Sequence, residues 1–138
     1  MIWFGYSHQS NGQYVNLSRG WNRLYVHAFF DYRRWSYSVK LWNRLPGGSE
    51  EDNRFDYEKF IGHGELDINY AFTRNDMGLR YAFSADGLEY GSLTADFTVP
   101  FSPSLSFYMR YFYGYGESLI DVDYKSNTLS IGFKVNEW

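Results

Sequence analysis

The sequence predicts an all-β protein, an antiparallel sheet that forms a transmembrane β-barrel. Apolar and polar residues alternate with a period of two along most of the 138 residues, as in strands with one apolar face. Aromatic residues make up 22% of the chain, an excess typical of barrels with aromatic girdles. No uninterrupted apolar run reaches about 18 residues, so the sequence offers no transmembrane helix.

The first two predicted strands, at about residues 2–10 and 21–31, enclose a polar loop at 11–20. We expect these strands to pair as a hairpin, with side chains alternating between two faces. One face carries Ile2, Phe4, Tyr6, His8 and Ser10 in the first strand and Asn22, Leu24, Val26, Ala28 and Phe30 in the second.

Six further strands follow the same alternation, which gives eight in all. Their apolar positions are Tyr37, Val39 and Leu41 in 35–43; Leu66, Ile68 and Tyr70 in 60–71; Met77, Leu79, Tyr81 and Phe83 in 77–84; Leu93, Ala95 and Phe97 in 89–98; Leu105, Phe107, Met109 and Tyr111 in 104–113; and Leu129, Ile131, Phe133 and Val135 in 128–136. Long loops at 45–57 and 114–127 mostly alternate with short turns, at 32–34, 73–76 and 100–103, as in outer-membrane barrels.

The polar face carries a charged residue in nearly every predicted strand. These residues are Arg23, Lys40, Glu65, Asp67, Arg80, Asp96, Arg110 and Lys134. Alternation alone does not separate a membrane barrel from a soluble sandwich or a soluble ligand-binding barrel, which would turn its charged face to water. Charges of both signs at mid-strand depth favour a barrel interior filled by ion pairs.

Composition excludes several other classes of protein. The chain has no cysteine, which rules out a disulfide framework and a thiolate metal site. Its net charge of −3, without a basic patch, argues against nucleic-acid binding. A run of 138 residues is at most one domain, so we expect residues 1–138 to form a single β-barrel domain.

The hairpin brings a histidine, a serine and an asparagine to one face. His8 and Ser10 are two apart in a strand, and Asn22 falls roughly opposite His8 when the two strands pair. Each has an ordinary explanation, as a girdle histidine, a strand-end serine and a loop-to-strand asparagine. On an apolar face, each of these three polar side chains would cost free energy if it had no hydrogen-bond partner. A hydrogen-bond network among the three accounts for all of them.

Three motifs in the chain resemble those of a known family. They are HQSNG at 8–12, SRGWNRLY at 18–25 and GYGESLID at 114–121. The first two resemble the active-site hairpin of the outer-membrane phospholipase A family, and the third resembles that family's last long loop. The resemblance extends from about Phe4 to the end of the chain.

The resemblance implies a role for each residue of the constellation. Ser10 would be the nucleophile that attacks an acyl ester, and His8 the general base and then general acid. Asn22 would hold the imidazole of His8 in the required tautomer. The backbone N–H of Gly12 is the candidate donor of the oxyanion hole, because glycine allows close approach.

The resemblance also implies a calcium ion beside this hairpin. Its ligands in this chain would be the backbone carbonyl of Gln13 and the hydroxyl of Ser18, with water molecules completing the shell. Both are hard oxygen donors, which suit calcium. No carboxylate lies between Asn11 and Asn22, so the site would carry little charge of its own.

The family's other properties set the remaining expectations. The family forms a twelve-stranded barrel in the outer membrane of Gram-negative bacteria, acts on membrane phospholipids and is active as a homodimer. The chain shows no signal peptide after Met1 and starts at the active-site hairpin, so we expect it to be the C-terminal part of such a barrel. The alternatives are a non-enzymatic small outer-membrane barrel and a soluble ligand-binding β-barrel.

Overall fold

The computed structural model describes residues 1–12, 19–45, 56–73, 76–84 and 87–135. It contains eight strands and one short helix within these ranges. In chain order they are β1 (Ile2–Ser10), β2 (Gly20–Tyr32), β3 (Trp35–Leu45), α1 (Tyr57–Ile61), β4 (Gly64–Ala71), β5 (Asp76–Ser84), β6 (Gly87–Ser102), β7 (Leu105–Gly114) and β8 (Ser126–Val135). No helix in the described part of the chain is long and apolar enough to cross a membrane.

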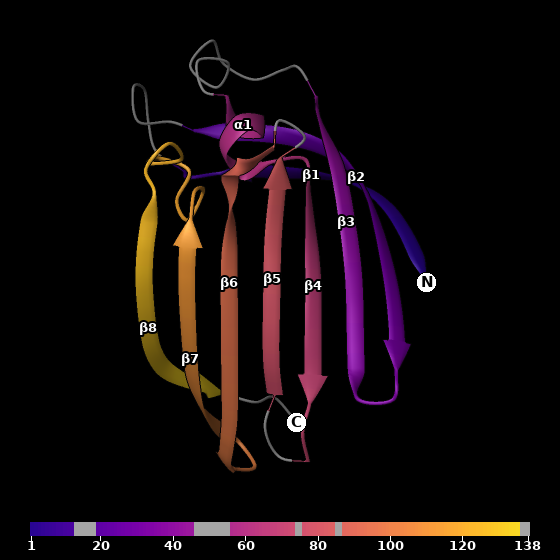
Figure 1. Ribbon diagram of the computed structural model, residues 1–138, viewed down its shortest axis with the longest axis vertical. Coiled ribbons are helices and arrows are strands. Elements are labelled where there is room, and N and C mark those ends of the chain that lie inside the picture. Colours follow the sequence, from indigo (N-terminus) through magenta and orange to yellow (C-terminus); the bar gives the residue numbers. More distant parts are fainter. Residues whose placement is uncertain (13–18, 46–55, 74–75, 85–86, 136–138) are drawn as a thin grey trace.

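The eight strands form one sheet in which every strand pairs antiparallel with its neighbour in sequence. The order is β1 to β8, so β1 and β8 are the two edges and the sheet is open. It is strongly curved, with α1 at one end and the β2–β3 and β6–β7 turns at the other (Figure 1). The structure confirms the predicted all-antiparallel sheet of eight strands.

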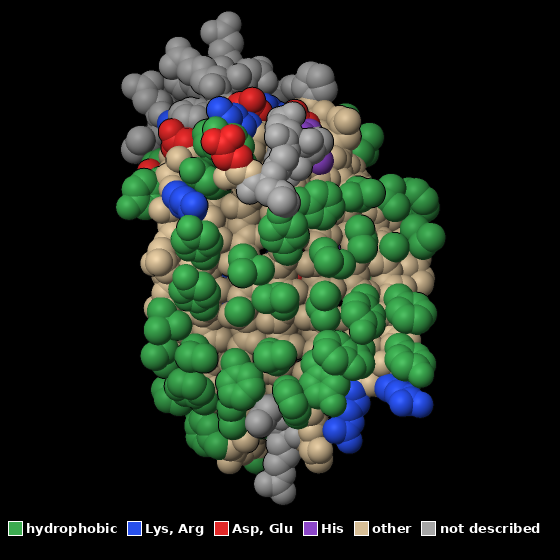
Figure 2. All heavy atoms as spheres, in the orientation of Figure 1, with side chains coloured by type: hydrophobic (Ala, Val, Ile, Leu, Met, Phe, Trp, Pro, Cys, Tyr) green, Lys and Arg blue, Asp and Glu red, His purple; other side chains and the backbone are tan. Residues whose placement is uncertain are grey.

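Apolar side chains cover the outer face of the sheet and remain exposed. Figure 2 shows them in rows across the strands. Exposed examples are Phe4 at 78%, Leu24 at 51%, Leu41 at 50%, Ile131 at 65% and Phe133 at 70%. A soluble sandwich would bury this face in its core. A continuous apolar wall of this kind suits a lipid environment instead.

The buried core is small and lies at the end of the sheet that carries α1. Its members are Trp21, Trp42, Tyr57, Leu119 and Val122, with Tyr25, Phe60 and Ile61 packed against them. The N-cap of α1 is Asp56, whose carboxylate accepts a hydrogen bond from the Lys59 backbone at 3.1 Å. This core joins β2 and β3 to α1 and to the connection between β7 and β8.

Two predicted boundaries are wrong. Residues 60–61, expected at the start of a strand, lie in α1, because Phe60 and Ile61 pack against the core instead of continuing the alternation. The segment 100–103, expected as a turn, is largely strand, since β6 continues to Ser102. Pro100 is tolerated there because the pairing register shifts between Pro100 and Ser102.

Candidate active site

The β1–β2 hairpin has the register that the sequence predicts. His8 pairs with Asn22, and Ser10 pairs with Gly20. Two hydrogen bonds close the base of the loop, from the Asn11 backbone to the Arg19 carbonyl and from the Arg19 backbone to the Asn11 side chain, both at 3.0 Å. The end of β1 is therefore held firmly beside the start of β2.

His8 and Asn22 contact each other on the outer face. The His8 Nδ1 lies 2.8 Å from the Asn22 Oδ1. An amide oxygen is an acceptor only, so this bond selects the tautomer that carries its proton on Nδ1 and leaves Nε2 as the free base. The structure therefore brings His8 and Asn22 into contact, and the catalytic role of this contact stays a prediction.

Tyr6 is a third member of this group that the sequence prediction missed. Its hydroxyl donates to the same Asn22 oxygen at 2.5 Å. Tyr6 lies two residues before His8 on the same face, and it pairs with Leu24 across the hairpin, so it reaches Asn22 diagonally. The two-residue spacing between Tyr6 and His8 was the sequence signal for this contact. A tyrosine of an aromatic girdle would have the same spacing, so the signal was not specific.

Ser10 lies on the same face as His8, two residues further along β1, and is exposed. Within the described residues it makes no hydrogen bond to His8. Catalytic hydrogen bonds are often long before substrate binds, so the absence of a bond between Ser10 and His8 is compatible with a catalytic role. Gly12 has a φ of 66°, and a Cβ placed there would have no neighbour within 4 Å, so its backbone is open to approach. Gln13 and Ser18 lie outside the described residues.

The inner face of the same hairpin carries a support network. The indole of Trp21 donates to the Gln9 side-chain oxygen at 3.3 Å, and Arg23 donates to the same oxygen at 3.0 Å. The Arg23 guanidinium lies 4.2 Å from the centre of the Trp21 ring and 5.3 Å from that of Trp42. Gln9 and Trp21 are direct neighbours in sequence of His8 and Asn22, so this network fixes the backbone that carries the outer residues.

An apolar hollow of about 660 Å³ lies on the wall next to His8 and Asn22. We call it the outer hollow; it is lined by Phe4, Gly5, Tyr6, Leu24, Tyr25, Val26, Leu41, Trp42 and Asn43. Tyr6 belongs both to this lining and to the hydrogen-bonded group. The outer hollow therefore begins beside the predicted reaction centre and extends from it along the wall.

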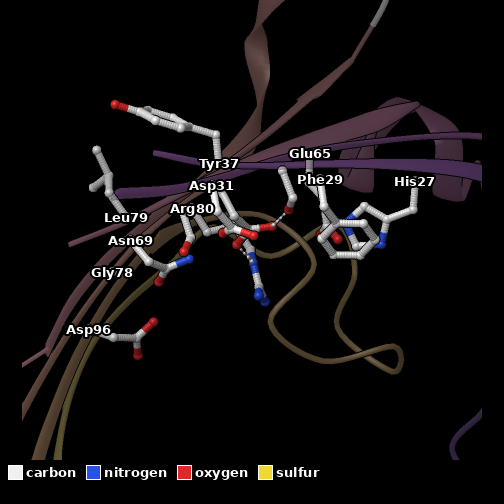
Figure 3. A pocket seen from close by; sticks show the side chains of 13 residues that line it. His27, Phe29, Asp31, Tyr37, Glu65, Asn69, Gly78, Leu79, Arg80 and Asp96 are labelled. Carbon is white, nitrogen blue, oxygen red and sulfur yellow. Dashed lines mark hydrogen bonds and ion pairs between the residues drawn. The ribbon is translucent and has the colours of Figure 1, made fainter. Parts of the chain in front are cut away.

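The concave face of the sheet is polar, and two ion pairs link neighbouring strands on it. In Figure 3, Arg80 lies on this face, while Tyr37 and Leu79 point to the other side of the sheet. The Arg80–Asp67 distance is 2.5 Å, and Ser38 adds a hydrogen bond to Asp67 at 3.4 Å. These contacts fit the predicted interior of ion pairs.

Further along the same face, Asp96 accepts a hydrogen bond from the Tyr108 hydroxyl and lies 3.9 Å from Arg110. In the part of the chain that the structure describes, no group of three or more histidine, aspartate or glutamate residues is arranged to hold a metal ion. This face therefore shows charge pairing without the donor set of a metal centre.

Comparison with known families and proteins gives a consistent result. The family model described as phospholipase A1 matches residues 1–135. A putative phospholipase A1 of Neisseria meningitidis is 34% identical over 99% of this chain and 36% of its own length. The phospholipase A1 of Proteus vulgaris is 32% identical over 97% of this chain and 45% of its own length. The chain thus spans less than half the length of these relatives.

Solved structures match the same fold. Outer membrane phospholipase A from Escherichia coli superposes with a TM-score of 0.88 at 29% identity, covering 99% of this chain and 51% of the other. The Salmonella typhi outer membrane phospholipase, a dimer with bound calcium, gives 0.88 at 30% identity, covering 99% and 52%. The match to the family model covers nearly the whole chain, and the chain belongs to the phospholipase A1 family.

Proposed function

We propose that this chain is part of an outer-membrane phospholipase A that hydrolyses acyl esters of phospholipids to lysophospholipid and free fatty acid. The observation that carries the proposal is the 2.8 Å contact between His8 and Asn22 on an exposed, apolar face, with Ser10 two residues along the same strand. Residues 1–138 would act as one domain of a barrel wall. The substrate of such a site is the lipid that the wall contacts.

The reaction begins with the hydroxyl of Ser10. Its oxygen attacks the acyl carbonyl carbon while the Nε2 of His8 takes the proton. The resulting imidazolium then gives that proton to the departing glycerol oxygen, which leaves an acyl-serine. Water, deprotonated by the same nitrogen, attacks this ester and releases the fatty acid, and Ser10 regains its proton.

Asn22 and Tyr6 orient the base. The Asn22 oxygen accepts from the Nδ1–H of His8, which leaves Nε2 as the nitrogen free to take the proton of Ser10. Asparagine is neutral, so it compensates the positive imidazolium less than a carboxylate would. The Tyr6 hydroxyl binds the second lone pair of the same oxygen and restrains the amide. A related structure, described as an active-site mutant of the Escherichia coli enzyme that replaces an asparagine with alanine, supports a role for an asparagine here.

The negative oxygen that develops on the carbonyl requires donors. Gly12 is exposed and has a φ of 66°, and we assign its N–H this role. We further propose that the Gln13 carbonyl and the Ser18 hydroxyl hold a calcium ion. The ion would supply positive charge near the oxyanion. The hydrogen bonds between Asn11 and Arg19 keep both ends of this loop beside Ser10, which fits that role.

The outer hollow supports a lipid substrate. Its lining is almost entirely apolar, and it begins at Tyr6, which also touches Asn22. An acyl chain lying along the wall would place its ester near Ser10 and its hydrocarbon against Leu24, Val26 and Leu41. Burial of an acyl chain gains roughly 0.8 kcal/mol per methylene group.

We place the protein in the outer membrane of a Gram-negative bacterium, as a homodimer in its active form. The exposed apolar wall supports the membrane location. The proposal of a dimer is supported by the Salmonella typhi neighbour, which is described as a dimer with bound calcium.

The test is fatty-acid release from mixed phospholipid–detergent micelles, measured with calcium and with a chelator. Two proteins should be compared: the 138-residue chain, and a chimera in which residues 1–138 replace the matching segment of the Proteus vulgaris relative. We expect calcium-dependent release by the chimera, lost in Ser10→Ala. A folded chimera that releases no fatty acid would contradict the proposal and favour the non-enzymatic barrel.

A further inference from the structure

The turn between β2 and β3 carries two adjacent arginines at the end of the sheet opposite to the active site. Tyr32 pairs with Trp35, so Arg33 and Arg34 are the two residues of the turn. Arg33 has a φ of 58°, in the left-handed region where glycine or asparagine is usual in a two-residue hairpin. An arginine is therefore present where local geometry favours a small, uncharged residue.

Both guanidinium groups are exposed, and within the described ranges neither forms an ion pair with a carboxylate. The Arg33 guanidinium lies 5.2 Å from the centre of the Tyr32 ring. A hollow of about 320 Å³ is lined by Arg33, Arg34, Trp35 and Tyr70. The described residues that line this hollow include no carboxylate, whereas Arg34 also borders a second hollow whose lining contains Asp76 and Asp96.

A continuous belt of aromatic rings adjoins this hollow on the outer face. Trp35 and Tyr70 lie 4.6 Å apart between ring centres, as do Tyr70 and Phe72, and Trp35 stacks on Tyr37 at 6.0 Å. Aromatic belts mark the level at which a bilayer meets water. Figure 2 shows basic side chains directly below the apolar wall at this end. The arginines therefore lie at headgroup level.

We propose that Arg33 and Arg34 bind the phosphate-bearing headgroup of an anionic phospholipid in the leaflet at this end of the barrel. A guanidinium matches phosphate oxygens with two parallel hydrogen bonds, and the Trp35 and Tyr70 rings flank the lipid backbone. This site lies roughly 35 Å from Asn22 along β2, far from the reaction centre. The inference rests on the membrane location in the proposed function and not on hydrolysis.

The test uses quenching of Trp35 fluorescence by brominated lipids in reconstituted vesicles. Brominated phosphatidylglycerol is compared with brominated phosphatidylcholine, each diluted into phosphatidylcholine. All proteins carry Ser10→Ala, so that no lipid is consumed. The Trp35 signal is the difference between each protein and its Trp35→Phe counterpart, which removes the contributions of the other tryptophans.

The test variant is Arg33→Asn with Arg34→Gln, because asparagine adopts a positive φ readily and should preserve the turn. The matched control is Lys59→Gln with Lys125→Gln, which removes the same charge from the other end of the sheet. Each basic residue near a membrane surface contributes about fivefold in binding. We expect phosphatidylglycerol to be preferred by roughly an order of magnitude, and the preference to survive in the control but not in the test variant.

Several outcomes would overturn the proposal. Equal quenching by both lipids, or a preference that persists in the arginine variant, would show that the two cations select no lipid. Absence of Trp35 quenching by either lipid would show that this end does not lie at a bilayer. Loss of the preference on addition of inorganic phosphate would identify a site for the free anion. Fatty-acid release, measured with Ser10 restored, should be unchanged in the arginine variant.

Discussion

The two faces of the β1–β2 hairpin place neighbouring residues in opposite environments. On the inner face, Trp21 is 1% exposed and belongs to the buried core, and it shares Gln9 with Arg23. On the outer face, Tyr6 is 59% exposed and meets His8 at the oxygen of Asn22. A soluble enzyme usually keeps its reactive groups in a cleft above a buried core. In this chain the proposed reactive groups lie on the outer face, and the residues that support them lie on the inner face.

The strand period of two explains this division. His8 and Gln9 are consecutive, as are Trp21 and Asn22, so each pair must point to opposite faces. Side chains on the inner face of the hairpin can therefore fix the positions of those on the outer face, because both sets are attached to the same backbone. The comparison predicts that inner substitutions reduce stability, whereas outer substitutions reduce catalysis with the fold intact.

The largest effect is expected on the inner face. Trp21→Ala should lower the free energy of unfolding by about 3–5 kcal/mol, because it leaves a cavity in the core beside Trp42 and Tyr57. Urea unfolding in detergent micelles measures this change. Trp3→Ala is the control. Because Trp3 is 52% exposed, its replacement should lower the free energy of unfolding much less. Trp3 lies on the same inner face but outside the buried core, so equal costs at the two positions would contradict the assignment of the core around Trp21 as the support.

An intermediate effect is expected at Asn22 on the outer face. Asn22→Ala should lower kcat about 10–100-fold, because a hydrogen bond to a charged imidazolium contributes about 1.5–3 kcal/mol. KM and the unfolding midpoint should change little, which steady-state kinetics and urea unfolding would show. Asn127→Ala is the matched control and should keep full activity, because Asn127 is an exposed asparagine of β8 that does not line the outer hollow. A loss of stability without a loss of kcat would show that Asn22 stabilises the fold and does not take part in catalysis.

The smallest effect is expected at Tyr6. Tyr6→Phe keeps the ring on the wall but removes the bond to Asn22, so kcat should fall about 2–10-fold. The loss should vanish when Asn22 is already alanine, because the hydroxyl then has no amide to restrain. An equal loss in both backgrounds would mean that Tyr6 acts independently of Asn22, for example by contacting substrate.

The sequence was sufficient for the sheet and for the cross-strand pairing of His8 with Asn22. Alternation located all eight strands, two-residue spacing placed His8 and Ser10 on one face, and hairpin pairing placed Asn22 opposite His8. It could not identify Tyr6 as a partner of Asn22, since an aromatic girdle predicts the same residue type. It also missed α1, whose Phe60 and Ile61 pack against a core that includes the distant residues Leu119 and Val122. Contacts between loops far apart in sequence leave no local period to detect.

The most direct test of the account is covalent labelling by a fluorophosphonate, a reagent that reacts with activated serine hydroxyls. The labelled protein should be digested and the modified peptide identified by mass spectrometry. The account predicts that Ser10 carries the label, that His8→Ala abolishes it and that Asn22→Ala slows it. Labelling of another serine, or labelling of Ser10 that persists at full rate without His8, would contradict the claim that the outer face of this hairpin performs the chemistry.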